Sequence, residues 1–115
     1  MVKESNLINS ITSELLKLLS GRITVDKIVL FGSYATGNFK PTSDIDYIIT
    51  SKEFRNKNIF EIADLTRNIE HQLIKLFPIP FDLLYYSDTD WLQNNSVTIN
   101  EAKKHGILLY SSDSN

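Results

Sequence analysis

One short apolar run constrains the fold of this chain more than any other feature. Residues 28–31 read Ile-Val-Leu-Phe, and the run stops abruptly at Gly32. A continuous apolar run of this length is typical of a strand buried on both faces, whereas a half-exposed strand alternates apolar and polar residues. We therefore expect a sheet with helices on both sides, and we expect Gly32 and Ser33 to form the turn that ends this strand.

The chain has the length and composition of one small folded domain. Its 115 residues are 42% hydrophobic and 23% charged, which is typical of a globular protein rather than a disordered one. A chain of this size is expected to hold one core and one active site, without a separate substrate-binding domain. We expect a single domain over residues 1–110, followed by a frayed polar tail at residues 111–115.

Charge and cysteine content argue against several classes of function. The net charge of -2 and the pI near 5.6 give no general attraction for nucleic acid or anionic lipid, so direct nucleic-acid binding is not expected. Cysteine is absent, so disulfides and thiolate metal sites are excluded. The N-terminal residues lack the apolar run of a signal peptide, and no run has transmembrane length. We expect a cytoplasmic protein that does not enter a membrane.

Apolar stripes at helical spacing predict two helices in the first two thirds of the chain. The first stripe falls within residues 7–19, with Ser5 as the expected N-cap. Asn58 and Glu61 form the pattern of a capping box, and the stripe that follows predicts one long helix over residues 59–77. Both helices present a continuous apolar side, so both are expected to pack on the sheet.

The last third of the chain predicts another helix, and three segments besides the apolar run predict strands. Asp88 and Asp90 are expected to start a helix that continues through Ala102 and ends with Gly106 in a left-handed cap. The expected strands are residues 44–50, 81–86 and 107–110. Helices and strands thus interleave, which predicts an α/β or α+β fold with a small mixed sheet of about four strands packed with helices.

Two aspartates lie two positions apart on the second expected strand. Because side chains alternate between the faces of a strand, Asp44 and Asp46 leave the same face, with Cα atoms roughly 6.5–7 Å apart. Magnesium prefers oxygen ligands, and two-metal phosphoryl-transfer sites hold their ions about 3.5–4 Å apart. The pair can therefore share cations, although an Asp-x-Asp pattern is common by chance in a chain with eight aspartates.

Two further features accompany this pair. Gly32 allows the backbone to approach a phosphate closely, and exposed N–H groups after the turn can bind its charge. Asp82 interrupts the apolar residues of the third expected strand, where burial would be costly unless the carboxylate met a metal or a donor. A carboxylate there could complete a metal's ligand set and take the proton from an attacking hydroxyl. Capping or surface solvation of the aspartates is the alternative, but it does not explain their strand positions.

The two histidines give no sign of a metal cage. His71 lies one turn from Arg67, and this pair is expected on a solvated helix face. His105, just before Gly106, is expected to be a helix-end residue near the negative end of the helix dipole rather than a ligand.

Several motifs together resemble those of a known family. Residues 30–37 read Leu-Phe-Gly-Ser-Tyr-Ala-Thr-Gly, and residues 41–46 read Pro-Thr-Ser-Asp-Ile-Asp. They resemble the minimal nucleotidyltransferases of the DNA polymerase beta superfamily, whose pattern is Gly-Ser, about ten residues, Asp-x-Asp and a later carboxylate on a strand. Here ten residues separate Ser33 from Asp44. The ending Gly-Ile-Leu-Leu-Tyr at 106–110 is also similar, so the resemblance covers nearly the whole chain.

The resemblance implies an activity and a role for each site residue. The implied fold is the polymerase beta-like catalytic core, and the implied reaction moves AMP from ATP to a hydroxyl and releases pyrophosphate. Asp44 and Asp46 would carry two Mg²⁺ ions. Asp82 would bind the catalytic ion and assist deprotonation of the acceptor. Gly32 and Ser33 would hold the triphosphate.

The resemblance also implies a partner. Stand-alone members of this size resemble antitoxins that adenylylate a tyrosine of a small helical HEPN ribonuclease. Two alternatives remain open, namely a nucleotidyltransferase acting on a small molecule such as an aminoglycoside, and a non-catalytic antitoxin that acts by occlusion. Thr36 stands where the family often has a basic residue, so one phosphate contact is either missing or supplied by Lys40 or a neighbouring chain.

Overall fold

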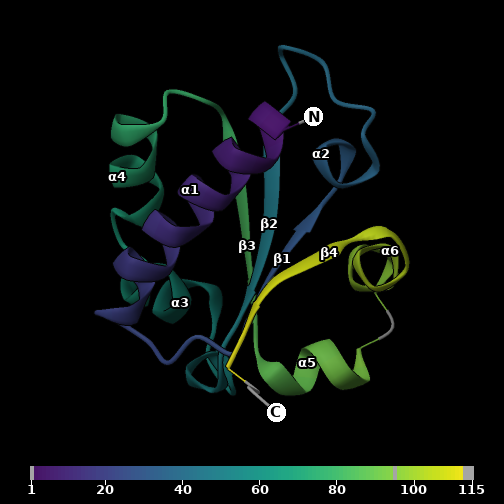
Figure 1. Ribbon diagram of the computed structural model, residues 1–115. Coiled ribbons are helices and arrows are strands. Elements are labelled where there is room, and N and C mark those ends of the chain that lie inside the picture. The colour runs from purple at the N-terminus through teal and green to yellow at the C-terminus, as the bar shows by residue number, and fades with distance from the viewer. Residues whose placement is uncertain (1, 95, 113–115) are drawn as a thin grey trace.

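The computed structural model describes the backbone of residues 2–94 and 96–112, with side chains from residue 6 onward. Helices and strands interleave along it as the sequence predicts (Figure 1). In chain order the elements are α1 (Val2–Ser20), β1 (Lys27–Phe31), α2 (Ser33–Thr36), β2 (Ile45–Thr50), the 3-10 turn η1 (Lys52–Phe54), α3 (Ile59–Leu65), α4 (Ile69–Leu76), β3 (Phe81–Tyr86), α5 (Asp88–Gln93), α6 (Val97–His105) and β4 (Ile107–Ser111).

The four strands form one mixed sheet in the order β3-β2-β1-β4. The central strand β1 runs antiparallel to both β2 and β4, whereas β2 and β3 are parallel. Helices α1, α3 and α4 lie on one side of the sheet, and α5 and α6 lie on the other (Figure 1). The predicted α+β fold with a four-stranded mixed sheet is confirmed.

Two separate hydrophobic clusters cover the two faces of β1, which explains why residues 28–31 form an uninterrupted apolar run. Ile28 and Leu30 of β1 belong to the larger cluster, which includes the buried side chains of α1 and α4. Val29 faces the other way and packs with Trp91 of α5 and Ile99 of α6. Successive side chains of β1 are therefore buried on opposite faces, which leaves no polar position within the run.

Two helix predictions in the first part of the chain need correction. Helix α1 already begins at Val2, so Ser5 lies within the helix and is not its N-cap. The expected long helix over residues 59–77 is two helices, α3 and α4. The break follows Thr66, whose hydroxyl donates to the carbonyl of Ile62 at 2.9 Å, and Asn68 then adopts a left-handed conformation with φ 67°. The predicted capping box at Asn58 is confirmed.

The expected helix after Asp88 is also divided. Ser87 caps α5 and Ser96 caps α6, and each side chain accepts the backbone N–H of the third residue of its helix. Gly106 has φ -79°, so the predicted left-handed cap is wrong. Its lack of a side chain matters because a Cβ there would lie 2.3 Å from the carbonyl oxygen of Ala102. Strand β4 includes Ser111, and residues 113–115 of the expected tail lie outside the described residues.

No helix in the described part of the chain combines the length and the apolar character needed to cross a bilayer.

Candidate functional site

The sheet brings the predicted aspartates to one end. Asp46 is paired in register with Asp82 across the parallel strands β2 and β3. Because neighbouring residues in register point to the same face of a sheet, the two carboxylates lie side by side. Asp44 directly precedes β2, two residues before Asp46, and shares its face. The three aspartates thus lie at one end of the sheet face that α5 and α6 cover.

The Gly-Ser turn lies against this group of carboxylates. Asp46 is opposite Phe31, the last residue of β1, and Gly32 follows at once. Gly32 has φ 72°, a region that favours glycine. A Cβ on Gly32 would lie 2.2 Å from Oδ2 of Asp46. Glycine is therefore required here twice, by its backbone conformation and by the space that the Asp46 carboxylate occupies.

The short helix α2 continues from the turn. The carbonyl of Gly32 accepts the N–H groups of Ala35 and Thr36 at 3.1 and 3.3 Å. Gly37 ends the helix in a left-handed conformation with φ 82°, and its N–H donates to the carbonyl of Ser33. Gly32 itself is exposed and Ser33 is half-buried, so a ligand can reach the turn.

The electrostatics of Asp46 reflect this crowding. The pKa of Asp46 is raised from 3.8 to about 6, first by burial, then by the charge of Asp82 and then by that of Asp44. Like charges close together disfavour simultaneous ionisation. Asp46 is half-buried, whereas Asp44 and Asp82 are exposed. The three aspartates therefore form one interacting cluster of negative charge.

One part of the sequence interpretation is wrong. Asp82 was expected to be buried among the apolar residues of its strand, but its side chain is exposed. The reason is topological, because β3 is the edge strand of the sheet and Asp82 lies near its start. Because Asp82 is exposed, it needs no metal to offset a cost of burying its charge. Its position beside Asp46 is what links it to the site.

The donor set suits a hard divalent cation. Three carboxylates at one end of a sheet offer the oxygen ligands that Mg²⁺ prefers, and a cation between them would relieve their repulsion. Within the described residues, however, no three acidic or histidine side chains are already arranged as a closed metal site. Binding would require the exposed side chains of Asp44 and Asp82 to turn toward Asp46.

Thr36 stands where the resemblance leads us to expect a basic residue, and it carries a neutral hydroxyl instead. The hydroxyl of Thr36 donates to the carbonyl of Ser33 at 3.4 Å and accepts from Nδ2 of Asn38 at 3.3 Å. Lys40 is exposed on the loop before β2, where its backbone N–H donates to Oγ of Ser43 at 2.8 Å. Thr36 is therefore bonded within its own turn.

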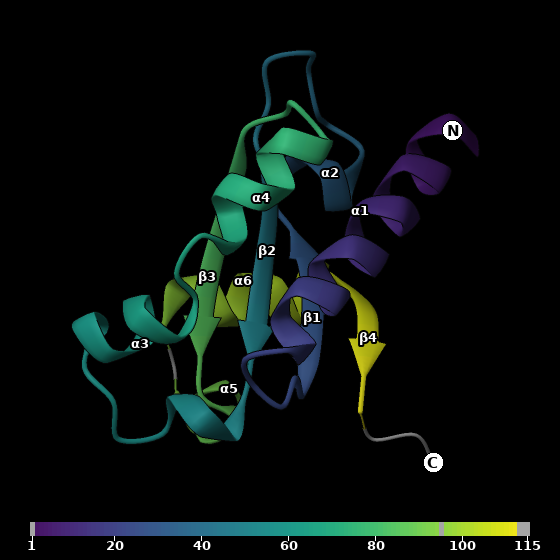
Figure 2. The same ribbon diagram turned by 90° about the vertical axis from the view of Figure 1, so that its left-hand side faces the viewer.

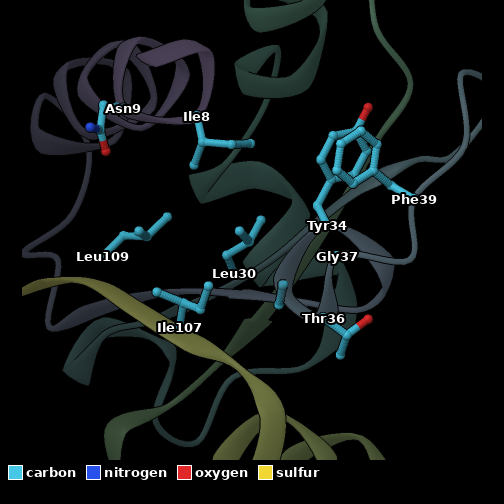
Figure 3. Close-up of a pocket in the computed structure, with 10 residues that line it drawn as sticks. Ile8, Asn9, Leu30, Tyr34, Thr36, Gly37, Phe39, Ile107 and Leu109 are labelled. Carbon is cyan, nitrogen blue, oxygen red and sulfur yellow. The ribbon is translucent and has the colours of Figure 1, made fainter. Parts of the chain in front are cut away.

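A cavity that the sequence did not predict lies across the sheet from the carboxylates. It has a volume of about 380 Å³ and lies between α1, the end of β1, α2 and β4 (Figure 3). Tyr34 and Phe39 stack at one end, with ring centroids 4.3 Å apart. Its lining carries no charged side chain. Four distant segments form it, so no local pattern could have revealed it.

Comparison with known proteins agrees with the fold and the motifs. The sequence profile of the nucleotidyltransferase domain family, described as "Nucleotidyltransferase domain", matches residues 9–109. No curated protein sequence gives a significant match.

Three solved structures share the architecture. The first is a provisionally assigned nucleotidyltransferase from Sulfolobus solfataricus, with a TM-score of 0.67, 15% identity and coverage of 99% of this chain and 89% of that chain. The second is a toxin-antitoxin with AMP-PNP, with a TM-score of 0.62, 22% identity and coverage of 88% and 73%. The third is the toxin-antitoxin MntA-HpeT with two Asp-to-Glu substitutions, with a TM-score of 0.60, 19% identity and coverage of 88% and 73%. At these identities the likeness concerns the fold.

Proposed function

The chain belongs to the nucleotidyltransferase domain family, and from that premise we propose that it transfers AMP from ATP, with Mg²⁺, to a hydroxyl of a partner protein. The observation that carries this proposal is the in-register pair Asp46 and Asp82 beside the Gly32 turn. It combines, at one end of the sheet, acidic ligands for cations and exposed backbone for a triphosphate. The proposed metal ligands are Asp44, Asp46 and Asp82.

The residues of the turn are proposed to hold the nucleotide. Gly32 has no side chain, so the phosphates can approach its backbone closely, and Ser33 adds a half-buried hydroxyl beside it. Backbone N–H groups at the start of a helix favour negative charge, so those at the start of α2 would also favour the phosphates. These contacts would orient the triphosphate with its α-phosphorus toward the carboxylates.

The carboxylates are proposed to divide two tasks. Two Mg²⁺ ions held by the three aspartates would neutralise the charge that develops on the phosphates. Asp82, exposed at the open edge of the sheet, is also placed to accept the proton of an incoming hydroxyl. The hydroxyl oxygen then bonds to the α-phosphorus as the bond to pyrophosphate breaks.

A protein acceptor is the proposal that the site and its relatives favour. Asp44 and Asp82 are exposed, so a large acceptor can reach them directly. Two of the similar structures are toxin-antitoxin assemblies, one of them with AMP-PNP. We therefore propose a small helical HEPN-type protein as the partner and a tyrosine hydroxyl as the acceptor. The absence of cysteine fits the reducing cytoplasm, which is the proposed location.

The experiment is mass spectrometry of the intact proteins. The chain is incubated with ATP, Mg²⁺ and the product of the neighbouring gene, and each transfer adds the mass of one AMP to the partner. The control is the double variant Asp44→Asn/Asp46→Asn, which keeps side-chain size and removes the charge. Modification by the double variant at the wild-type rate would refute the assignment of the site.

A second function is favoured by Thr36, which is bonded within its own turn and supplies no charge. The chain would then inhibit its partner by occlusion without chemistry. In that case the double variant would still inhibit the partner, and the partner would carry no AMP.

A further inference from the structure

Helix α6 lies across the sheet face that carries the aspartates. Its buried residues Ile99 and Ala102 pack on Val29 of β1 and Ile48 of β2. Figure 2 shows α6 behind the sheet, running from the β3 side toward β1 and β4. The helix therefore covers the same face of the sheet as the aspartates, with its C-terminal end next to β1.

The C-terminal end of α6 is fixed close to the Gly-Ser turn. Ile107, two residues beyond His105, pairs with Leu30 across β4 and β1. A Cβ on Gly106 would lie 3.0 Å from the carbonyl oxygen of Leu30. Leu30 is only two residues before Gly32. The backbone of His105 is consequently next to the end of β1 from which the turn starts.

Contacts on α6 define which side of the helix faces the aspartates. Nζ of Lys103 lies 5.4 Å from the ring centroid of Trp91, and α5, which carries Trp91, contacts η1 at the far end of β2. Lys103 therefore points away from the aspartates. Each residue turns a helix by about 100°, so His105 lies about 200° around from Lys103. His105 is thus on the side that faces the aspartate end of the sheet.

A carboxylate on the same side of α6 lies near His105. Oε1 of Glu101 lies 4.0 Å from Nε2 of His105, one helical turn away. Both side chains remain mostly exposed, at 62% and 60%. The imidazole thus lies near a carboxylate and is exposed to a ligand.

We propose that His105 donates a hydrogen bond to the triphosphate of the bound nucleotide and supplies the contact that Thr36 cannot make. Glu101 acts as a positioning residue that orients the imidazole. The inference rests on the proposed function, because it needs a nucleotide at the Gly-Ser turn. It gives His105 a role beyond that of a residue at a helix end.

The test is calorimetric binding of AMP-PNP and of AMP, each with Mg²⁺, to the full chain. His105→Ala, which has no side-chain donor, is expected to weaken AMP-PNP binding about tenfold, the effect of losing one hydrogen bond to a charged group. AMP, which lacks the outer phosphates, should bind both proteins equally. His105→Lys restores a donor and should recover most of the lost affinity. Thermal unfolding of each variant checks that the exposed substitution leaves the fold intact.

Lys104→Gln is the matched control, since Lys104 is adjacent, exposed and basic. It should bind AMP-PNP as the wild type does. Equal binding by His105→Ala and the wild type would overturn this inference and leave the proposed function standing, as would an equal loss in Lys104→Gln. Failure of the wild type to bind AMP-PNP would overturn the proposed function and this inference together.

Discussion

Asp46 and Asp82 stand opposite each other in register on the parallel strands β2 and β3, and the Asp46 carboxylate fills the space that a Cβ on Gly32 would need. This relationship joins two motifs separated by many residues. The turn leaves room for one carboxylate, and the strand pairing sets the second beside it. A change at any one of the three residues should therefore affect the same site.

Replacing Asp82 should reduce AMP transfer while leaving the stability of the chain almost unchanged. Asp82 is exposed on an edge strand, so Asp82→Asn should change the free energy of unfolding by less than about 0.5 kcal/mol. If Asp82 accepts the acceptor's proton, AMP transfer should fall at least about a hundredfold. Intact-mass kinetics measure the transfer and urea unfolding measures the stability. Unchanged transfer would remove Asp82 from the mechanism.

Replacement of Gly32 tests the close packing of the turn. In Gly32→Ala the new Cβ meets Oδ2 of Asp46 at 2.2 Å and the residue keeps a positive φ, so we expect a loss of about 2–4 kcal/mol in the free energy of unfolding. Gly37→Ala is the matched control, since Gly37 also has positive φ but a Cβ there would meet nothing within 4 Å. It should lose only about 1 kcal/mol. Equal losses in urea unfolding would show that Asp46 does not occupy this space.

The raised pKa of Asp46 predicts that Asp46→Asn, which should inactivate the site, increases the stability of the folded chain. Because this pKa is about 6 in the folded chain against 3.8 ordinarily, its contribution to stability is complete below pH 3.8 and is lost as the pH rises through about 6. Asparagine does not ionise, so Asp46→Asn does not lose stability as the pH rises through this range. At pH 7 without metal it should be more stable by on the order of 1 kcal/mol, allowing for solvent screening.

Urea unfolding from pH 4 to pH 7 checks this prediction. The two proteins should converge toward pH 4, where Asp46 holds its proton, which makes the low-pH measurement an internal control. A constant difference across the range would mean that the change in stability has another cause.

Divalent cations should stabilise the wild-type chain through the same three residues. At Mg²⁺ tenfold above its dissociation constant, the free energy of unfolding should rise by about 1.4 kcal/mol, which corresponds to a midpoint higher by roughly 6–11 °C. EDTA should reverse the shift. The variant Asp44→Asn/Asp46→Asn should show little response, and an equal shift in that variant would place cation binding elsewhere.

Local patterns predicted the strands and the layers correctly. The uninterrupted apolar run 28–31 marked the central strand, and the alternation after Asp44 and Phe81 marked its neighbours. These signals depend on which residues a strand buries, and the sequence carries that information directly. The abrupt end of the same run also marked Gly32 as the residue where the chain leaves the strand.

Features set by contacts between distant segments were missed. The apolar spacing from 59 to 77 continues through the break at Asn68, so periodicity could not show that the chain turns there. The exposure of Asp82 depends on β3 being an edge strand. The position of His105 beside the turn depends on the pairing of β4 with β1. The last two features depend on strand pairing and are not encoded by neighbouring residues.

The most direct test of nucleotidyl transfer follows the fate of labelled ATP. The chain is incubated with its partner, Mg²⁺ and ATP labelled at either the α- or the γ-phosphate. If AMP is transferred, the partner acquires the α-label and not the γ-label, and Asp44→Asn/Asp46→Asn transfers neither. Incorporation of the γ-label, or incorporation of the α-label by that variant at the wild-type rate, would contradict the central claim.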